Sequence, residues 1–150
     1  GQSIVSDGIE NWIGTVKISG SELAKNLKLH PLDIRVHLQQ AQIDAFLTQI
    51  TKDGNYLLRA EKTLTEALSL SPRRQQVQYM LGMLELQLSQ PEKAVRVIQE
   101  SIDNDPKVAE GWRRLLFVYE FSRDKQKAAE TIAKAKNYGF DLQSNLIGEK

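Results

Sequence analysis

The chain has 150 residues, of which 41% are hydrophobic and 26% are charged, and its formal net charge at pH 7 is +1. This composition is typical of a folded protein the size of one domain or a short repeat array, and it excludes a disordered chain. Because the charge is balanced and spread along the chain, nucleic acid is disfavoured as the main partner.

The first twenty residues predict a partly helical N-terminal segment, residues 1–20. Apolar side chains recur there at the spacing of one helix face: Ile9, Trp12, Ile13 and Val16. Gly14 and Gly20 predict interruptions of that helix. Two interpretations of the segment stay open: a helix that caps the following structure and covers Trp12, or a membrane-proximal or dimer-forming segment.

Residues 21–29 predict a capped amphipathic helix, and a longer helix is expected over roughly residues 33 to 52. The apolar positions of this second helix are Ile34, Leu38, Ala41 and Ala45. It should end at the turn formed by residues 52–55. His30 precedes a proline and therefore lies off the helix, while His37 stands four residues after Asp33. We interpret these histidines as solvated or ion-paired at the surface, not as metal ligands.

A repeat with a period of about 34 residues is the main signal in the sequence. Ala60, Ala94 and Ala128 are spaced by this interval. Four and seven residues after each alanine stand a branched aliphatic and a small residue, namely Leu64 and Ala67, Ile98 and Ser101, and Ile132 and Ala135. The spacing of 0, +4 and +7 is one face of a helix, so these residues should be buried.

The prolines follow the same period. Pro72 and Pro106 are separated by the same interval as the alanines, whereas Pro31 precedes Pro72 by seven positions more. The difference predicts an insertion of that length before Ala60. We expect Pro72 and Pro106 to occupy first helical positions, with the preceding residues Ser71 and Asp105 as N-caps.

The third unit carries the motif that identifies the repeat, with the residues Trp112, Leu115, Tyr119, Ala128, Ile132 and Ala135. This pattern resembles the tetratricopeptide repeat. The second unit matches it less closely, with Leu81, Gly82, Ala94 and Ile98 but with Gln78 and Glu85 at aromatic positions. The first unit departs most, because His37, Gln40 and Asp44 stand at patterned apolar positions.

The resemblance implies an all-α fold, a right-handed α-solenoid of about three helix pairs. The resemblance covers residues 31 to about 140. With the preceding helix we expect a helical repeat domain over residues 21–140, which ends at the helix-stopping Gly139. Phe140, Leu142, Leu146 and Ile147 continue sparsely beyond it, so residues 141–150 should form a tail or a short capping helix.

In tetratricopeptide proteins the first helix of each pair lines a groove that holds a peptide or helix. The matching positions here are Leu38, Gln42, Gln76, Tyr79, Met83, Leu86, Glu110, Arg113, Phe117 and Glu120. The resulting stripe is apolar in the middle and edged by Arg113, which suits a peptide with apolar anchors. The alternative that these side chains complete the packing between repeats stays open, above all for Leu86. The chaperone-tail clamp is not expected, because Leu38 and Gln42 stand where that clamp has lysine and asparagine.

The sequence carries no pattern that indicates catalysis. It contains no cysteine, which excludes disulfides and thiolate chemistry, and it has no HExxH, phosphate-loop or dinucleotide motif. Glu61 and Glu66 fall on predicted solvent faces. We therefore expect no catalytic residue, cofactor or metal in this part of the protein, and a protein or peptide as its partner.

Three short strings carry a second resemblance, Pro31–Arg35, Leu70–Val77 and Tyr138–Phe140. They are similar to the tetratricopeptide tail of bacterial O-antigen ligase-like membrane proteins. This resemblance implies the soluble module of a polysaccharide-transferring membrane protein, with its catalytic machinery elsewhere. A homo-oligomer formed through Trp12 or the tails is a further alternative, and the compartment, cytoplasmic or extracytoplasmic, stays open.

Overall fold

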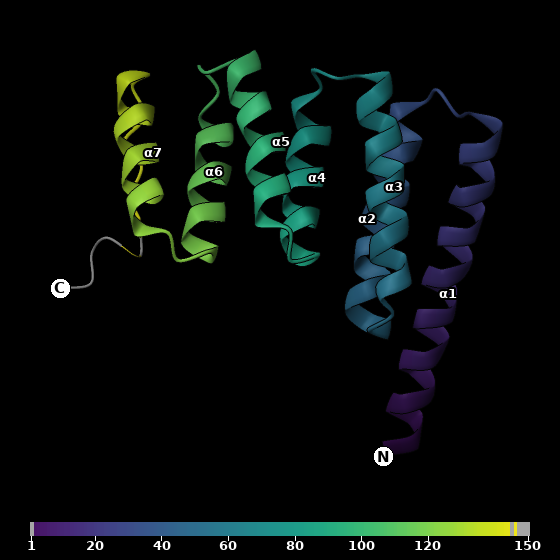
Figure 1. Cartoon of the computed structure of the whole chain (residues 1–150). Coiled ribbons are helices and arrows are strands. Elements are labelled where there is room, and N and C mark those ends of the chain that lie inside the picture. Colours follow the sequence, from purple (N-terminus) through teal and green to yellow (C-terminus); the bar gives the residue numbers. More distant parts are fainter. Residues whose placement is uncertain (1, 145, 147–150) are drawn as a thin grey trace. The chain divides into compact units, whose positions relative to one another are not determined.

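A computed structural model describes residues 2–144 and 146, which contain seven α-helices and no strand (Figure 1). The helices are α1 (Gln2–Leu29), α2 (Ile34–Thr51), α3 (Gly54–Leu70), α4 (Gln75–Gln87), α5 (Pro91–Asn104), α6 (Ala109–Phe121) and α7 (Lys125–Asn137). The chain forms two compact units, Gly1–Pro72 with α1–α3, and Arg73–Lys150 with α4–α7. The expected all-α class is confirmed. None of the described helices combines the length and the hydropathy needed to cross a membrane.

Helix α1 is one continuous helix of 28 residues, so the interruptions expected at Gly14 and Gly20 are wrong. The reason is visible at Gly20, which is buried against α2. A Cβ atom at Gly20 would lie 3.0 Å from Cγ2 of Ile43 and 3.4 Å from Cδ1 of Leu47. The glycine therefore permits close packing of α1 on α2 and does not end the helix. The division expected at residue 20 falls inside α1.

Helix α2 agrees with the longer helix expected from the insertion. It has 18 residues, against 13 in α4 and 13 in α6. It begins at the N-cap Asp33, whose side chain accepts a hydrogen bond from the Arg35 backbone N–H at 2.9 Å. It ends at Lys52, which has the left-handed φ of 58° that closes many helices.

The prolines do not occupy first helical positions, and this expectation is wrong for both of them. Pro72 and Pro106 lie in the turns between helices, after the C-caps Ser71 and Asp105. Proline is favoured just beyond a helix end because it cannot continue the helix. Pro91, which does not follow the repeat period, is the proline that starts a helix, at the N-terminus of α5.

Most of the small and aliphatic residues of the repeat belong to the cores of the two units, whereas Ile132, which was expected to be buried, is only partly buried. Ala60, Ala94 and Ala128 are all fully buried on the second helix of their pairs, as their spacing predicts. In the second unit a cluster continues from these positions with Leu86, Ala94, Ile98, Ile102, Trp112, Leu115, Val118 and Ala135. The periodic residues are therefore the residues that hold each helix pair together.

Helix α2 buries polar residues that the sequence places at patterned apolar positions. His37, Gln40 and Asp44 are buried, whereas Ile34 and Ala45 of the expected apolar ladder are only half-buried. The expected apolar ladder is therefore confirmed for Leu38 and Ala41, which are buried, and wrong for Ile34 and Ala45. The polar residues keep the position that the repeat assigns to them. Inside the unit His37 Nδ1 bonds the Asp33 carbonyl, and Gln40 Nε2 donates to Asp44.

The C-terminal segment begins as expected, with Gly139 at a φ of 86° directly after Tyr138, the C-cap of α7. Phe140 and Leu142 then pack against the core of the second unit. The Phe140 backbone N–H donates to the Ala135 carbonyl at 3.1 Å, which closes the helix end. The expectation for Ile147 lies outside the described residues.

Substitution of Gly82 tests how tightly α4 packs on α5. A Cβ atom at Gly82 would lie 2.6 Å from Cγ1 of the buried Ile98, so we expect Gly82→Ala to overpack the core. Overpacking exceeds the gain in helix propensity, and the free energy of unfolding should fall by about 1 kcal/mol in urea denaturation. Gly14→Ala is the matched control, because nothing lies within 4 Å of its Cβ position and the helix gains stability. Equal effects of the two substitutions would contradict the packing argument.

Candidate peptide-binding surface

The second unit has an open hollow formed by α4 and α6. It measures about 330 Å³ and is lined by Met83, Glu110, Arg113, Arg114 and Phe117. Four of these five residues belong to the groove expected from the sequence, and the fifth, Arg114, does not. The structure therefore brings part of the expected stripe together on one face of one unit.

A carboxylate between two arginines sets the charge of this hollow. Arg114 donates from Nε to Oε1 of Glu110 at 2.7 Å, and its guanidinium also lies 5.6 Å from the ring centre of Tyr79. Arg113 makes a looser ion pair, with Nη1 at 3.8 Å from Oε2 of Glu110. Arg114 is thus held in place, whereas Arg113 is exposed and can turn toward a ligand.

Tyr79 lies at the inner side of this cluster. Burial raises the pKa of its phenol, and the carboxylate of Glu110 acts in the same direction. The ring is therefore a neutral platform under Arg114 near neutral pH, in a geometry that suits a cation–π contact. Tyr79 therefore contacts Arg114 but does not itself line the hollow.

Two phenylalanines extend the hollow along α6. Phe117 has half of its surface exposed and Phe121 has 63% exposed, and their ring centres lie 6.4 Å apart. The sequence prediction missed Phe121, although its position one helical turn after Phe117 is a signal that would have found it. Neighbouring exposed aromatic rings are uncommon on a surface without a partner.

The remaining expected groove residues do not line this hollow. Leu86 and Leu38 are buried core residues, which supports the packing interpretation for these two. Gln76 is exposed outside the hollow, and Gln42 is exposed on α2 of the first unit. Glu120 accepts a hydrogen bond from the Ser144 hydroxyl at 2.6 Å. Its carboxylate is therefore engaged by the C-terminal segment.

The first unit contains a buried ion pair that the sequence did not predict. Asp44 on α2 is fully buried and pairs with Arg59 on α3, whose Nε lies 2.8 Å from Oδ2 of Asp44. Gln40 donates from Nε2 to the same carboxylate at 3.0 Å. The hydrogen bonds to Asp44 raise the pKa of the Arg59 guanidinium. The ion pair links the two helices of one pair, so it stabilises the packing of α2 on α3.

His37 is not the surface histidine that the sequence suggested. It is buried, and its Nδ1 lies 2.9 Å from the Asp33 backbone carbonyl. The Asp33 carboxylate pairs instead with Arg35, which holds the pKa of that carboxyl below its usual range. His30 is exposed, as expected. Among the described residues, no group of three acidic or histidine side chains is placed to bind a metal ion.

Solved structures similar to this chain decide the fold. MamA from Desulfovibrio magneticus RS-1, residue 41 to the end, matches with a TM-score of 0.68 and 21% identity, over 87% of this chain and 70% of that chain. A MamA RS-1 double mutant matches with a TM-score of 0.66 and 21% identity, over 84% and 67%. The TPR protein TTC0263 from Thermus thermophilus matches with a TM-score of 0.70 and 17% identity, over 86% and 68%.

The fold is of the tetratricopeptide type. The fold class expected from the repeat period, an all-α solenoid of tetratricopeptide helix pairs, is confirmed. No family model and no curated protein matches the chain. At identities near 20% these likenesses establish the fold, and the resemblance to the O-antigen ligase tail stays a prediction.

Proposed function

We propose that this chain is a non-catalytic scaffold that binds a peptide or helix of a partner protein on the surface formed by α4 and α6. The observation that carries the proposal is the apolar hollow of Met83 and Phe117, extended by Phe121 and bordered by the exposed Arg113. Aromatic side chains, methionine and arginine are the residues that dominate protein-interaction surfaces. The fold supports the same role, because stacked helix pairs present extended binding surfaces.

The residues of this surface indicate which kind of ligand it would bind. Phe117 and Phe121 lie one turn apart on α6, so they can accept apolar side chains that are themselves one helical turn apart. Arg113 has only a loose pairing with Glu110 and can bind a carboxylate of the ligand. We therefore expect an amphipathic segment with apolar anchors and an acidic residue beside them.

Phe117→Ala tests this proposal with peptides selected from a random phage-displayed library against the intact chain. We expect the selected peptides to combine apolar anchors with acidic residues, and the substitution to weaken their binding by about 2 kcal/mol, or roughly 30-fold. Isothermal titration calorimetry measures the difference. Leu58→Ala is the matched control, because Leu58 is a similarly exposed apolar residue of the first unit.

Two outcomes would contradict the proposal. Peptides that bind Phe117→Ala as tightly as the unchanged chain would place the binding surface elsewhere. Arg113→Glu should weaken the binding of acidic peptides more than that of neutral ones. An unchanged affinity for acidic peptides would show that Arg113 does not bind a carboxylate of the ligand. The homo-oligomer and the membrane-protein module stay predictions, and light scattering of the purified chain separates the former from a monomeric scaffold.

A further inference from the structure

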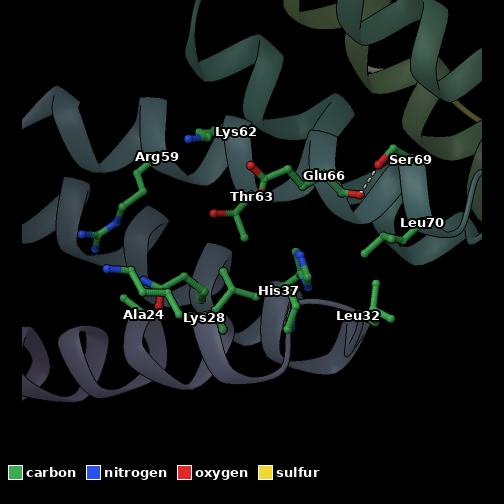
Figure 2. Close-up of a pocket in the computed structure, with 13 residues that line it drawn as sticks. Ala24, Lys28, Leu32, His37, Arg59, Lys62, Thr63, Glu66, Ser69 and Leu70 are labelled. Carbon is green, nitrogen blue, oxygen red and sulfur yellow. Dashed lines mark hydrogen bonds between the residues drawn. The ribbon is translucent and has the colours of Figure 1, made fainter.

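A hollow between α1, α2 and α3 lies wholly within the first unit (Figure 2). This α1–α3 hollow measures about 610 Å³, and its inner side is lined by His37 and Gln40 of α2, which are almost fully buried. Its wall on α3 reaches from Arg59 to Leu70, a rise of about 16 Å along the helix. An open hollow of that length can hold about five residues of an extended chain.

A hollow at this place is a feature of the repeat, because α5, α6 and α7 form one as well. The α5–α7 hollow measures about 490 Å³, and its lining includes Ile102, Asp103, Pro106, Trp112, Lys134 and Tyr138. Pro31 and His37 hold the same repeat positions as Pro106 and Trp112, so the two hollows are equivalent. The residues that differ between them therefore show which chemistry is particular to the first unit.

Two lysines of the α1–α3 hollow stand where the third helix pair, α6 and α7, has acidic residues. Lys28 lies three residues before the repeat proline, and Asp103 holds that position in the α5–α7 hollow. Lys62 lies two residues after the repeat alanine, and Glu130 of α7 holds that position in the third pair. The geometry recurs along the repeat, whereas the positive charge belongs to the first unit.

These two lysines are available to a ligand. Both are exposed, and neither forms a salt bridge with another described residue. Figure 2 shows them on opposite sides of the hollow, Lys28 on α1 and Lys62 on α3. Arg59 also lines the hollow but pairs with Asp44, and Glu66 is the acidic residue of the lining. Two unpaired cations against one carboxylate favour an acidic ligand that enters between the helices.

One end of the hollow is apolar and exposed. Leu32 and Leu70 lie there, and Figure 2 shows Arg59 toward the other end. Leu32 is 76% exposed and Leu70 is 43% exposed. Leu32 follows the repeat proline directly, and the residue at that position in the third helix pair is Lys107. Leucines this exposed beside one hollow are suited to contact with an aliphatic side chain of a partner.

We propose that the α1–α3 hollow binds an acidic segment of a partner protein. An aliphatic side chain of that segment lies against Leu32 and Leu70, and its carboxylates lie between Lys28 and Lys62. A peptide fits this site better than a membrane surface does, because the two lysines face each other across a recess that a flat bilayer does not enter. The site is separate from the surface formed by α4 and α6 and does not rest on it.

NMR titration of the isotopically labelled chain tests the site with defined probes. The probes are the capped heptapeptide Ser-Leu-Ser-Glu-Glu-Ser-Ser and its reversed sequence, which together cover both chain directions. We expect at least one of them to shift the amide signals of residues 24–32 and 59–70 saturably and to leave residues 99–107 and 130–138 unchanged. Replacing both glutamates of the peptide with glutamine should weaken binding about tenfold, and replacing its leucine with serine about fivefold.

Variants separate this site from nonspecific attraction by charge. Lys28→Asp combined with Lys62→Glu introduces the residues of the third helix pair and should weaken binding of the acidic peptide at least tenfold. Both lysines are exposed, so the core stays intact. Lys17→Asp combined with Lys136→Glu is the matched control, because it changes the net charge equally at exposed positions outside the hollow. Leu32→Ser should weaken the leucine peptide about fivefold and leave binding of its serine analogue unchanged.

Four results would overturn the proposal. The first is no saturable shift with either peptide up to about 10 mM. The second is equal binding of the glutamate and glutamine peptides, and the third is unchanged affinity in the lysine double variant. The fourth is binding to phosphatidylglycerol vesicles that depends on Lys28 and Lys62 while neither peptide binds, which would assign the site to a membrane. Phe117→Ala should leave peptide binding here intact, so failure of this proposal is distinguishable from failure of the proposed scaffold function.

Discussion

Replacing Trp112 with alanine is expected to lower the free energy of unfolding by about 3–5 kcal/mol. The indole is 4% exposed and belongs to the core of the second unit. The substitution removes this packing, the hydrogen bond from Nε1 to the Pro106 carbonyl, and the stacking on Tyr138. Urea denaturation followed by circular dichroism at the helical band measures the loss, because that signal does not depend on the tryptophan itself.

Trp12→Ala is the matched control, since Trp12 and Trp112 are the two tryptophans of the chain. Trp12 is 49% exposed and meets Phe46 edge to face at 5.4 Å. We expect a loss of about 1 kcal/mol, the range measured for an aromatic pair. A smaller loss for Trp112→Ala than for Trp12→Ala would show that the repeat motif does not mark the core residue.

The repeat could be predicted from the sequence because several positions recur in each unit. Ala60, Ala94 and Ala128 are fully buried at the same position on the second helix of each pair. Trp112 was readable as well, since its spacing to Leu115 and the later alanines matches a known motif. A constant repeat period fixes which face of each helix is buried, even where single residues depart from the pattern.

The buried polar residues of the first unit could not be predicted from the sequence. Asp44 and Arg59 stand on different helices with a turn between them, so no local spacing links them. Asp44 stands at a patterned apolar position of the repeat, where a lone carboxylate is costly to bury. Its burial requires a partner, and that partner becomes visible only when α2 and α3 are packed together.

The sequence predicted only part of the candidate peptide surface, because motif spacing does not fix precisely which residues of a helix are exposed. Met83 and Phe117 face one hollow as the motif implies, whereas Leu86 turns into the core. Motif spacing gives the face of a helix to within about one residue, roughly 100° of rotation. That uncertainty is enough to exchange a core position for a surface position. Phe121 is the opposite case, because it is exposed although the motif spacing did not place it on the binding face.

Arg59→Leu is expected to be the second strongly destabilising change, with a loss of about 3 kcal/mol in the free energy of unfolding at neutral pH. Asp44 is fully buried, and the substitution leaves its carboxylate with the Gln40 amide as its remaining side-chain hydrogen bond. The side chain of Arg59 is 42% exposed, which places the expected loss at the lower end of the range for buried pairs. Urea denaturation at pH 7 measures it.

A double variant distinguishes the cost of an unpaired carboxylate from simple loss of the arginine side chain. Asp44→Asn keeps the shape of the residue and removes its charge, so Arg59→Leu combined with Asp44→Asn should be more stable than Arg59→Leu alone. Arg35→Leu is the matched control, because Arg35 pairs with Asp33 at the surface of the same unit and its loss should change stability little. If the double variant is no more stable than Arg59→Leu, the arginine stabilises the unit through its packing on α3, and the charge of Asp44 is not the cause.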